Sequence, residues 1–150
     1  MECNYKNKAK EILGIWGNAE EICKEKSERV IELKRLCKEA SDIKSVQLSH
    51  LPKSNNFNSY IEKSVIKNID VYEKTIVKLE DDIREVLDIK AHIDSWVSFL
   101  ETDEMKVITL RYREGLSWDY IPDIIHKSRM QCFRIHNKVI GKLNFEMPLN

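Results

Sequence analysis

Two long stretches of the chain place apolar residues at alternating steps of three and four. In the first stretch these positions are Ile12, Trp16, Ala19, Cys23, Val30, Leu33, Cys37 and Ala40, and a polar slot holds Lys26. In the second they are Val65, Ile69, Tyr72, Ile76, Leu79, Ile83, Val86, Ile93, Val97 and Leu100, and the interruption is Lys90. This spacing is typical of helices that pack along a seam, whereas a strand would alternate with a period of two. The pattern predicts an all-α fold.

Glycine and proline interrupt these stretches sparsely. Neither residue occurs between Gly17 and Pro52, or between Pro52 and Gly115. The segment at about 49–59, around Pro52, is rich in Asn and Ser and is expected to be a loop. We therefore predict a helical hairpin or coiled-coil arm over residues 1–100. The seam partner can be the other arm of the same chain or a second copy of the chain, and the sequence leaves both open.

The start of the first arm contains two glycines. Gly14 and Gly17 weaken a helix, and Asn18 followed by Glu21 could cap a new one. The apolar phase runs through both glycines without a shift, however. We therefore expect one bent helix there.

The last third of the chain holds three short apolar clusters, at 103–113, 117–126 and 128–144. Gly115 suits the left-handed residue that ends a helix, and Ser128 suits the cap that begins one. Two short helices joined by a tight turn describe a helix-turn-helix. Residues 101–150 are therefore expected to form a helix-turn-helix domain, in which Pro122 should kink or loosen the first helix of the motif.

The last of these helices is expected to be basic on one side and apolar on the other. Its apolar stripe is Cys132, Ile135, Val139 and Leu143. Between residues 127 and 145 there are five bases and no acid; the bases are Lys127, Arg129, Arg134, Lys138 and Lys142. Arginine can bind guanine, glutamine and asparagine can bind adenine, and lysine can neutralise phosphate. The face therefore fits double-stranded DNA, against the alternative of an ordinary solvated surface.

The stretch LRYREGLSW at 110–118, followed by HKSRMQCFRIHNKVIGKL at 126–143, resembles region 4 of bacterial sigma factors. It resembles still more the ArpU/RinA-like late-gene activators of phages that infect Gram-positive hosts. This resemblance implies a phage or prophage transcription regulator that reads a promoter-upstream element and contacts bacterial RNA polymerase. No counterpart of the sigma region that melts promoters is present, so we do not expect a complete sigma factor.

The resemblance also assigns roles within the last helix. The residues implied to read bases are Arg129, Met130, Gln131, Phe133 and Arg134. Those implied to hold phosphates are Ser117, Lys127, Ser128, Asn137 and Lys138. Sigma factors usually carry Glu at the position of Met130 and Gln at that of Arg134, so the preferred DNA should differ from a host −35 element. Phe133 lies between the two faces and can either touch a thymine methyl or pack inward.

Composition and the absence of known motifs exclude several other classes of protein. The chain has 150 residues, and its 25 Lys and Arg balance its 25 Asp and Glu. It contains no apolar run long enough for a membrane span and its first ten residues hold no signal sequence, so a cytoplasmic, nucleoid-associated protein is expected. The four cysteines form no CxxC pair, and Cys132 with His126 and His136 lacks a fourth metal ligand. No nucleophile elbow, P-loop or dinucleotide motif occurs. We expect no enzyme activity, no cofactor and no metal.

Two other function classes remain open. A small-terminase-like packaging protein also joins a helix-turn-helix to helical oligomerisation segments. A coiled-coil module that binds another protein would use the basic helix only as surface. For the regulator we expect a homodimer formed through the helical arm.

Overall fold

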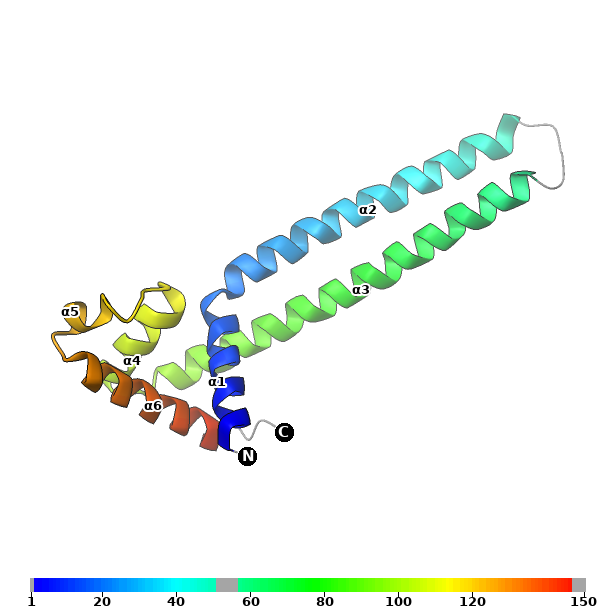
Figure 1. Cartoon of the computed structure of the whole chain (residues 1–150). Coiled ribbons are helices and arrows are strands. Elements are labelled where there is room, and N and C mark those ends of the chain that lie inside the picture. Colours follow the sequence, from blue (N-terminus) through cyan, green and yellow to red (C-terminus); the bar gives the residue numbers. More distant parts are fainter. Residues whose placement is uncertain (1, 51–56, 147–150) are drawn as a thin grey trace. The chain divides into compact units, whose positions relative to one another are not determined.

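The computed structural model describes residues 2–50 and 57–146, and their side chains over 8–42 and 67–145. All regular elements in these ranges are helical, which confirms the predicted all-α class (Figure 1). The longest helices are α2 (Ala19–His50) and α3 (Phe57–Val97). No helix within the described ranges is long and apolar enough to cross a membrane. Most of the expected loop at 49–59 lies outside the described residues.

The helices divide between two compact units. A globular unit consists of Met1–Ile22 and Glu85–Asn150, and a hairpin unit consists of Cys23–Arg84. The expected boundary at residue 100 therefore does not match the packing. The first helix and the last turns of α3 join the C-terminal helices, because their apolar faces are buried there.

The two helices of the hairpin unit pack on each other along the predicted seam. Val30 and Leu33 of α2 pack on Ile76 of α3 in the same chain, and the partly buried residues around them are Leu36, Cys37, Tyr72 and Leu79. The polar slot of the first arm is explained by an ion pair. Lys26 Nζ lies 2.6 Å from Asp82 Oδ2 across the seam.

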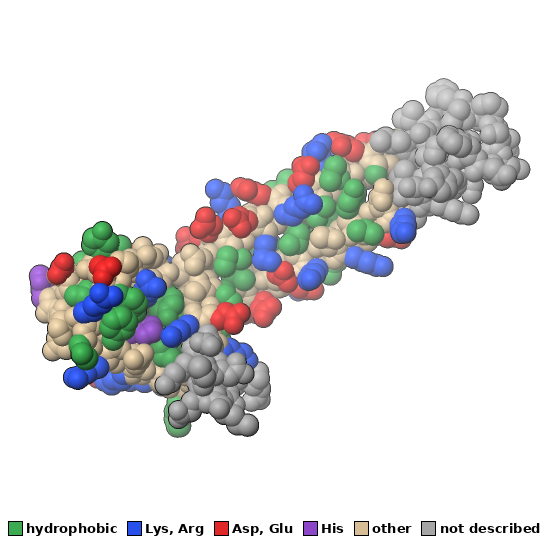
Figure 2. All heavy atoms as spheres, in the orientation of Figure 1, with side chains coloured by type: hydrophobic (Ala, Val, Ile, Leu, Met, Phe, Trp, Pro, Cys, Tyr) green, Lys and Arg blue, Asp and Glu red, His purple; other side chains and the backbone are tan. Residues whose placement is uncertain are grey.

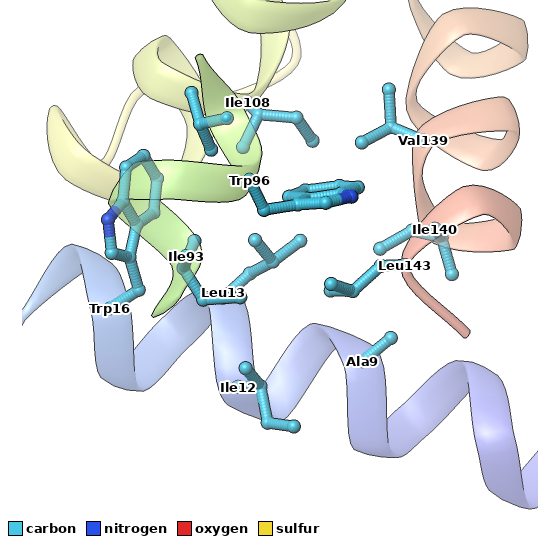
Figure 3. Packing of buried hydrophobic residues seen from close by; sticks show 11 residues of the cluster. Ala9, Ile12, Leu13, Trp16, Ile93, Trp96, Ile108, Val139, Ile140 and Leu143 are labelled. Carbon is cyan, nitrogen blue, oxygen red and sulfur yellow. The ribbon is translucent and has the colours of Figure 1, made fainter. Parts of the chain in front are cut away.

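The globular unit has the larger core, shown in Figure 3. Its buried residues are Ala9, Ile12, Leu13, Trp16, Ile93, Trp96, Val97, Ile108, Val139, Ile140 and Leu143. They come from α1 (Glu2–Gly17), the end of α3, α4 (Thr102–Ile108) and α6 (Arg129–Glu146). Lys90, the other polar interruption, pairs with Asp94 at 2.9 Å, and Asp94 also accepts a hydrogen bond of 2.8 Å from the indole N–H of Trp16. Both breaks in the apolar pattern are thus ion-paired positions.

The start of the chain forms two helices and not the single bent helix expected. Helix α1 ends at Gly17 and α2 begins at Ala19. The side-chain amide of Asn18 donates a hydrogen bond of 2.9 Å to the carbonyl of Gly14, at the end of α1. At Gly17 the backbone is so close to the Tyr112 carbonyl that a Cβ would lie 1.8 Å from its oxygen. The glycine permits this contact between α1 and the C-terminal helices.

The expectation of a kink at Pro122 is wrong. Helix α5 (Ile121–Ile125) begins one residue before the proline. In the first turn of a helix the missing N–H has no partner to lose, and the fixed φ of proline suits the geometry. Pro122 therefore helps α5 to start.

Candidate nucleic-acid interface

Helix α6 follows α5 after a turn of three residues, His126, Lys127 and Ser128. His126 ends α5 in the left-handed conformation, with φ 54°. At the other side of the turn, the N–H of Gln131 donates to Ser128 Oγ at 3.3 Å, and the N–H of Ser128 donates to Gln131 Oε1 at 2.9 Å. This reciprocal pair is a capping box, and it satisfies two backbone donors at the start of α6. Two predicted DNA contacts, Ser128 and Gln131, are thus already used to begin the helix.

The apolar stripe predicted for α6 faces the core. Cys132, Val139 and Leu143 are fully buried, and Ile135 is partly buried. The opposite side is exposed; it carries Arg129, Met130, Gln131, Arg134, Asn137 and Lys138. The fold therefore brings most of the predicted base-reading and phosphate-binding residues to one surface, which we call the α6 face.

Acidic side chains from the preceding segments neutralise most of the bases near this face. The pairs are Lys127 with Asp103 at 2.9 Å, Arg129 with Asp119 at 3.0 Å, Lys138 with Glu104 at 2.9 Å and with Glu101 at 3.6 Å, and Lys142 with Glu104 at 2.7 Å. Of the five bases between 127 and 145, only Arg134 has no ion pair with the described residues. Figure 2 shows Lys and Arg interspersed with Asp and Glu on the visible surface. The positive charge of the segment 127–145 is therefore largely balanced by the acids that pack beside it.

Glu104 differs from the other acids because its side chain is buried. Burial alone would raise the pKa of this carboxyl. Hydrogen bonds from Lys142 and Lys138, and from the backbone N–H of Glu101, outweigh that effect and hold the pKa below its ordinary value. Lys138 thus supports the start of α4 and its packing on α6. Its predicted phosphate contact remains a prediction.

Phe133 packs against Trp118, in the segment that precedes α5. Their ring centroids are 4.6 Å apart, and the side of Phe133 away from the core keeps 36% of the residue exposed. The guanidinium of Arg111 lies 5.3 Å from the Trp118 ring, and that of Arg129 lies 5.8 Å from the Phe133 ring. Phe133 therefore packs on Trp118 and stays partly exposed, and its predicted contact with a thymine methyl remains a prediction.

His136 of α6 is buried beside these rings and pairs with the half-buried Tyr112. His136 is 5% exposed, and its Nε2 forms a hydrogen bond of 3.0 Å with the Tyr112 hydroxyl. Burial lowers the pKa of His136, so its imidazole is neutral at pH 7. Within the described residues no group of three or more His, Cys, Asp or Glu is placed to hold a metal. His136 contacts the Tyr112 and Trp118 rings and thereby joins α6 to the segments before it.

Two further predicted phosphate contacts have different surroundings. Ser117 Oγ accepts a hydrogen bond of 3.3 Å from the N–H of Asp119, in the turn before α5. This bond orders the turn that carries Trp118 and Asp119. Asn137 is exposed on α6, four residues after Phe133 and one turn beyond Arg134.

The acids around α6 are the part of the site that sequence reasoning missed. They lie at 101–104 and at 119, outside the acid-free segment that marks the basic helix. Charge read along the chain cannot show that these segments pack beside α6. The sequence offers one indirect signal, Gly115, whose left-handed backbone (φ 66°) ends the segment after α4.

Comparisons with curated proteins and with solved structures gave no match. Residues 38–144 match a family described as protein of unknown function (DUF722). The matched segment covers more than half of the chain and includes α5 and all but the last two residues of α6. The chain belongs to the DUF722 family.

Proposed function

We propose that the protein is a sequence-specific regulator of transcription that binds double-stranded DNA through the exposed face of α6. The observation that carries this proposal is the orientation of α6. Cys132 and Val139 fix one side of the helix in the core, while Arg129, Met130 and Arg134 of its first turns stay exposed. A helix held in this way can enter the major groove with its N-terminal residues at the base edges.

The residue types on this face suit base recognition. Arg134 is exposed and has no ion pair with the described residues, so its guanidinium can bind guanine O6 and N7. Asn137, which the resemblance implies to be a phosphate contact, lies on the same side of the helix, and its amide is also suited to bind adenine. Met130 is 64% exposed and offers an apolar contact. These three residues are close on the helix surface because their spacing is four and three.

The ion pairs limit how much contacts with phosphate can contribute to DNA affinity. Lys127 and Lys138 must exchange Asp103 and Glu104 for phosphate before they add to DNA affinity. Non-specific binding depends on such cations and falls steeply with salt. The proposal therefore expects weak binding to random DNA and a larger share of affinity from base contacts.

The resemblance to phage late-gene activators supports a promoter-upstream target. In this role the hairpin unit would form a homodimer, and RNA polymerase would be the protein partner. No catalytic step is part of the proposal.

Fluorescence anisotropy with duplexes from upstream of the protein's own operon tests the proposal. We expect tighter binding than to a scrambled duplex, and a loss of about 1–3 kcal/mol for Arg134→Ala. Arg84→Ala is the matched control, since Arg84 is exposed on α3 and bonds Asp81 and the Glu80 carbonyl within the same helix. It should bind like wild type.

Other outcomes separate the remaining function classes. Equal affinity for operon and scrambled DNA would contradict sequence recognition. A ring of eight or more subunits would favour DNA packaging. Absence of DNA binding at every salt concentration, with polymerase binding retained, would favour a protein-binding module.

A further inference from the structure

Arg129, the first residue of α6, is held from two directions. Its Nη1 lies 3.0 Å from Asp119 Oδ1, and its guanidinium lies 5.8 Å from the centroid of the Phe133 ring. The side chains of Arg129 and Asp119 are 61% and 69% exposed, so this pair faces solvent at the edge of the α6 face. An exposed pair of this kind contributes little to folding stability. Its position next to the base-reading residues points to another role.

The support behind Arg129 is continuous with the core. Phe133 packs on Trp118, and the edge of Trp118 lies against buried His136, with centroids 5.1 Å apart. Arg111 covers Trp118 and also donates a hydrogen bond of 2.9 Å to the Leu116 carbonyl. The guanidinium of Arg129 is thus the exposed end of a packed series of rings.

Such a support changes what the arginine can do. A flexible arginine loses side-chain entropy when it binds, and ordering it beforehand reduces that cost. The guanidinium has five N–H donors, and the ion pair with Asp119 uses those on Nη1. The remaining donors can still bind guanine O6 and N7. The carboxylate of Asp119 meanwhile repels phosphate and can accept a hydrogen bond from the amino group of a neighbouring cytosine or adenine.

We propose that Asp119 is a positioning residue that makes Arg129 a reader of guanine and prevents it from acting as a phosphate contact. Phe133 supports the same guanidinium from below. This inference rests on the proposed DNA-binding function and deepens it, because it names the base and the residue that sets the preference.

The test begins with selection of duplexes from a randomised library by the full chain. Each guanine of the selected site is then replaced by 7-deazaguanine, which lacks the N7 acceptor and keeps Watson–Crick pairing. For wild type we expect one guanine at which this replacement weakens binding about tenfold. In Asp119→Asn that difference should fall to about twofold or less, while affinity for random duplexes stays equal or rises. Asp119→Glu, which keeps the carboxylate, should restore part of the discrimination.

Asp103→Asn is the matched control. It removes the same charge from the partner of Lys127, a residue that the resemblance implies to be a phosphate contact. We expect higher affinity for all duplexes and an unchanged guanine preference. Circular dichroism of each variant verifies the fold.

The two failures are distinct. If wild type enriches no sequence, the proposed function is overturned, and this assignment with it. If Asp119→Asn retains the full discrimination at the guanine, or if Asp103→Asn loses it equally, the assignment to Asp119 alone is overturned.

Discussion

At the scale of single residues, Gly17 is fixed by a close approach of two backbones. A Cβ there would lie 1.8 Å from the Tyr112 carbonyl oxygen, so Gly17→Ala must push α1 away from the segment after α4. We expect a loss of about 1–3 kcal/mol in the free energy of unfolding, measured with urea. Gly14→Ala is the control, since nothing lies within 4 Å of its Cβ position. It should stabilise the helix by about 0.5–1 kcal/mol. Equal effects of the two substitutions would contradict the close contact.

Glu104 gives the globular unit a dependence on pH. Its pKa is below the ordinary value of 4.5, so the folded state holds the ionised carboxyl more strongly than the unfolded chain does. This stabilisation is present above pH 4.5 and is lost as the pH falls through the lower, folded pKa. Glu104→Gln should lower stability at pH 7 and flatten this acid dependence. The measurement is the free energy of unfolding of wild type and variant from pH 7 down to pH 3. If the carboxyl were unimportant, both would lose stability with falling pH to the same extent.

At the scale of elements, the apolar spacing predicted the helices and the seam of the hairpin. Val30, Leu33 and Ile76 pack as their positions required. The same spacing also led to an error, because it runs without a shift from Trp16 into the hairpin. The apolar spacing of a helix shows which of its faces is buried, but it does not show which element covers that face. Trp16 is buried in the core of the globular unit, where its indole N–H bonds Asp94 of α3 and the guanidinium of Arg113 lies 5.4 Å from its ring.

The candidate site shows a similar limit. The exposed side of α6 could be predicted from its period, and its capping residue from the Ser type. The acids that pair with its bases could not, because Asp103 and Asp119 come close to Lys127 and Arg129 only in the assembled fold. Charge balance around a helix depends on neighbours that sequence order does not show.

The hairpin seam allows a matched pair of substitutions. Leu33 is 2% exposed and packs on α3, whereas Leu87 is 49% exposed. We expect Leu33→Ala to lower the free energy of unfolding by about 2–4 kcal/mol, because it opens a cavity between α2 and α3. Leu87→Ala removes the same atoms and should cost less than about 1 kcal/mol. Urea unfolding followed by helical circular dichroism measures both. Similar losses would mean that the seam is not the main packing of this unit.

At the scale of the whole molecule, charge and assembly are linked. The chain carries 25 basic and 25 acidic residues, and the bases near α6 are largely paired within the fold. One α6 face therefore offers few free cations to a duplex. Affinity that relies on base contacts from a single short helix is weak. A second α6 face in the same assembly would double those contacts, on a site with two half-sites.

We accordingly expect a light-scattering mass of twice 17.7 kDa for the full chain at micromolar concentration. The two copies should bind one duplex, so the footprint should contain two copies of the selected sequence related by a two-fold axis. The hairpin unit leaves Ile31 and Val77 exposed, at 68% and 56%, which gives a second copy apolar surface to cover. A monomer that binds a single half-site with full affinity would contradict the dimer, and a much larger ring would favour packaging over regulation.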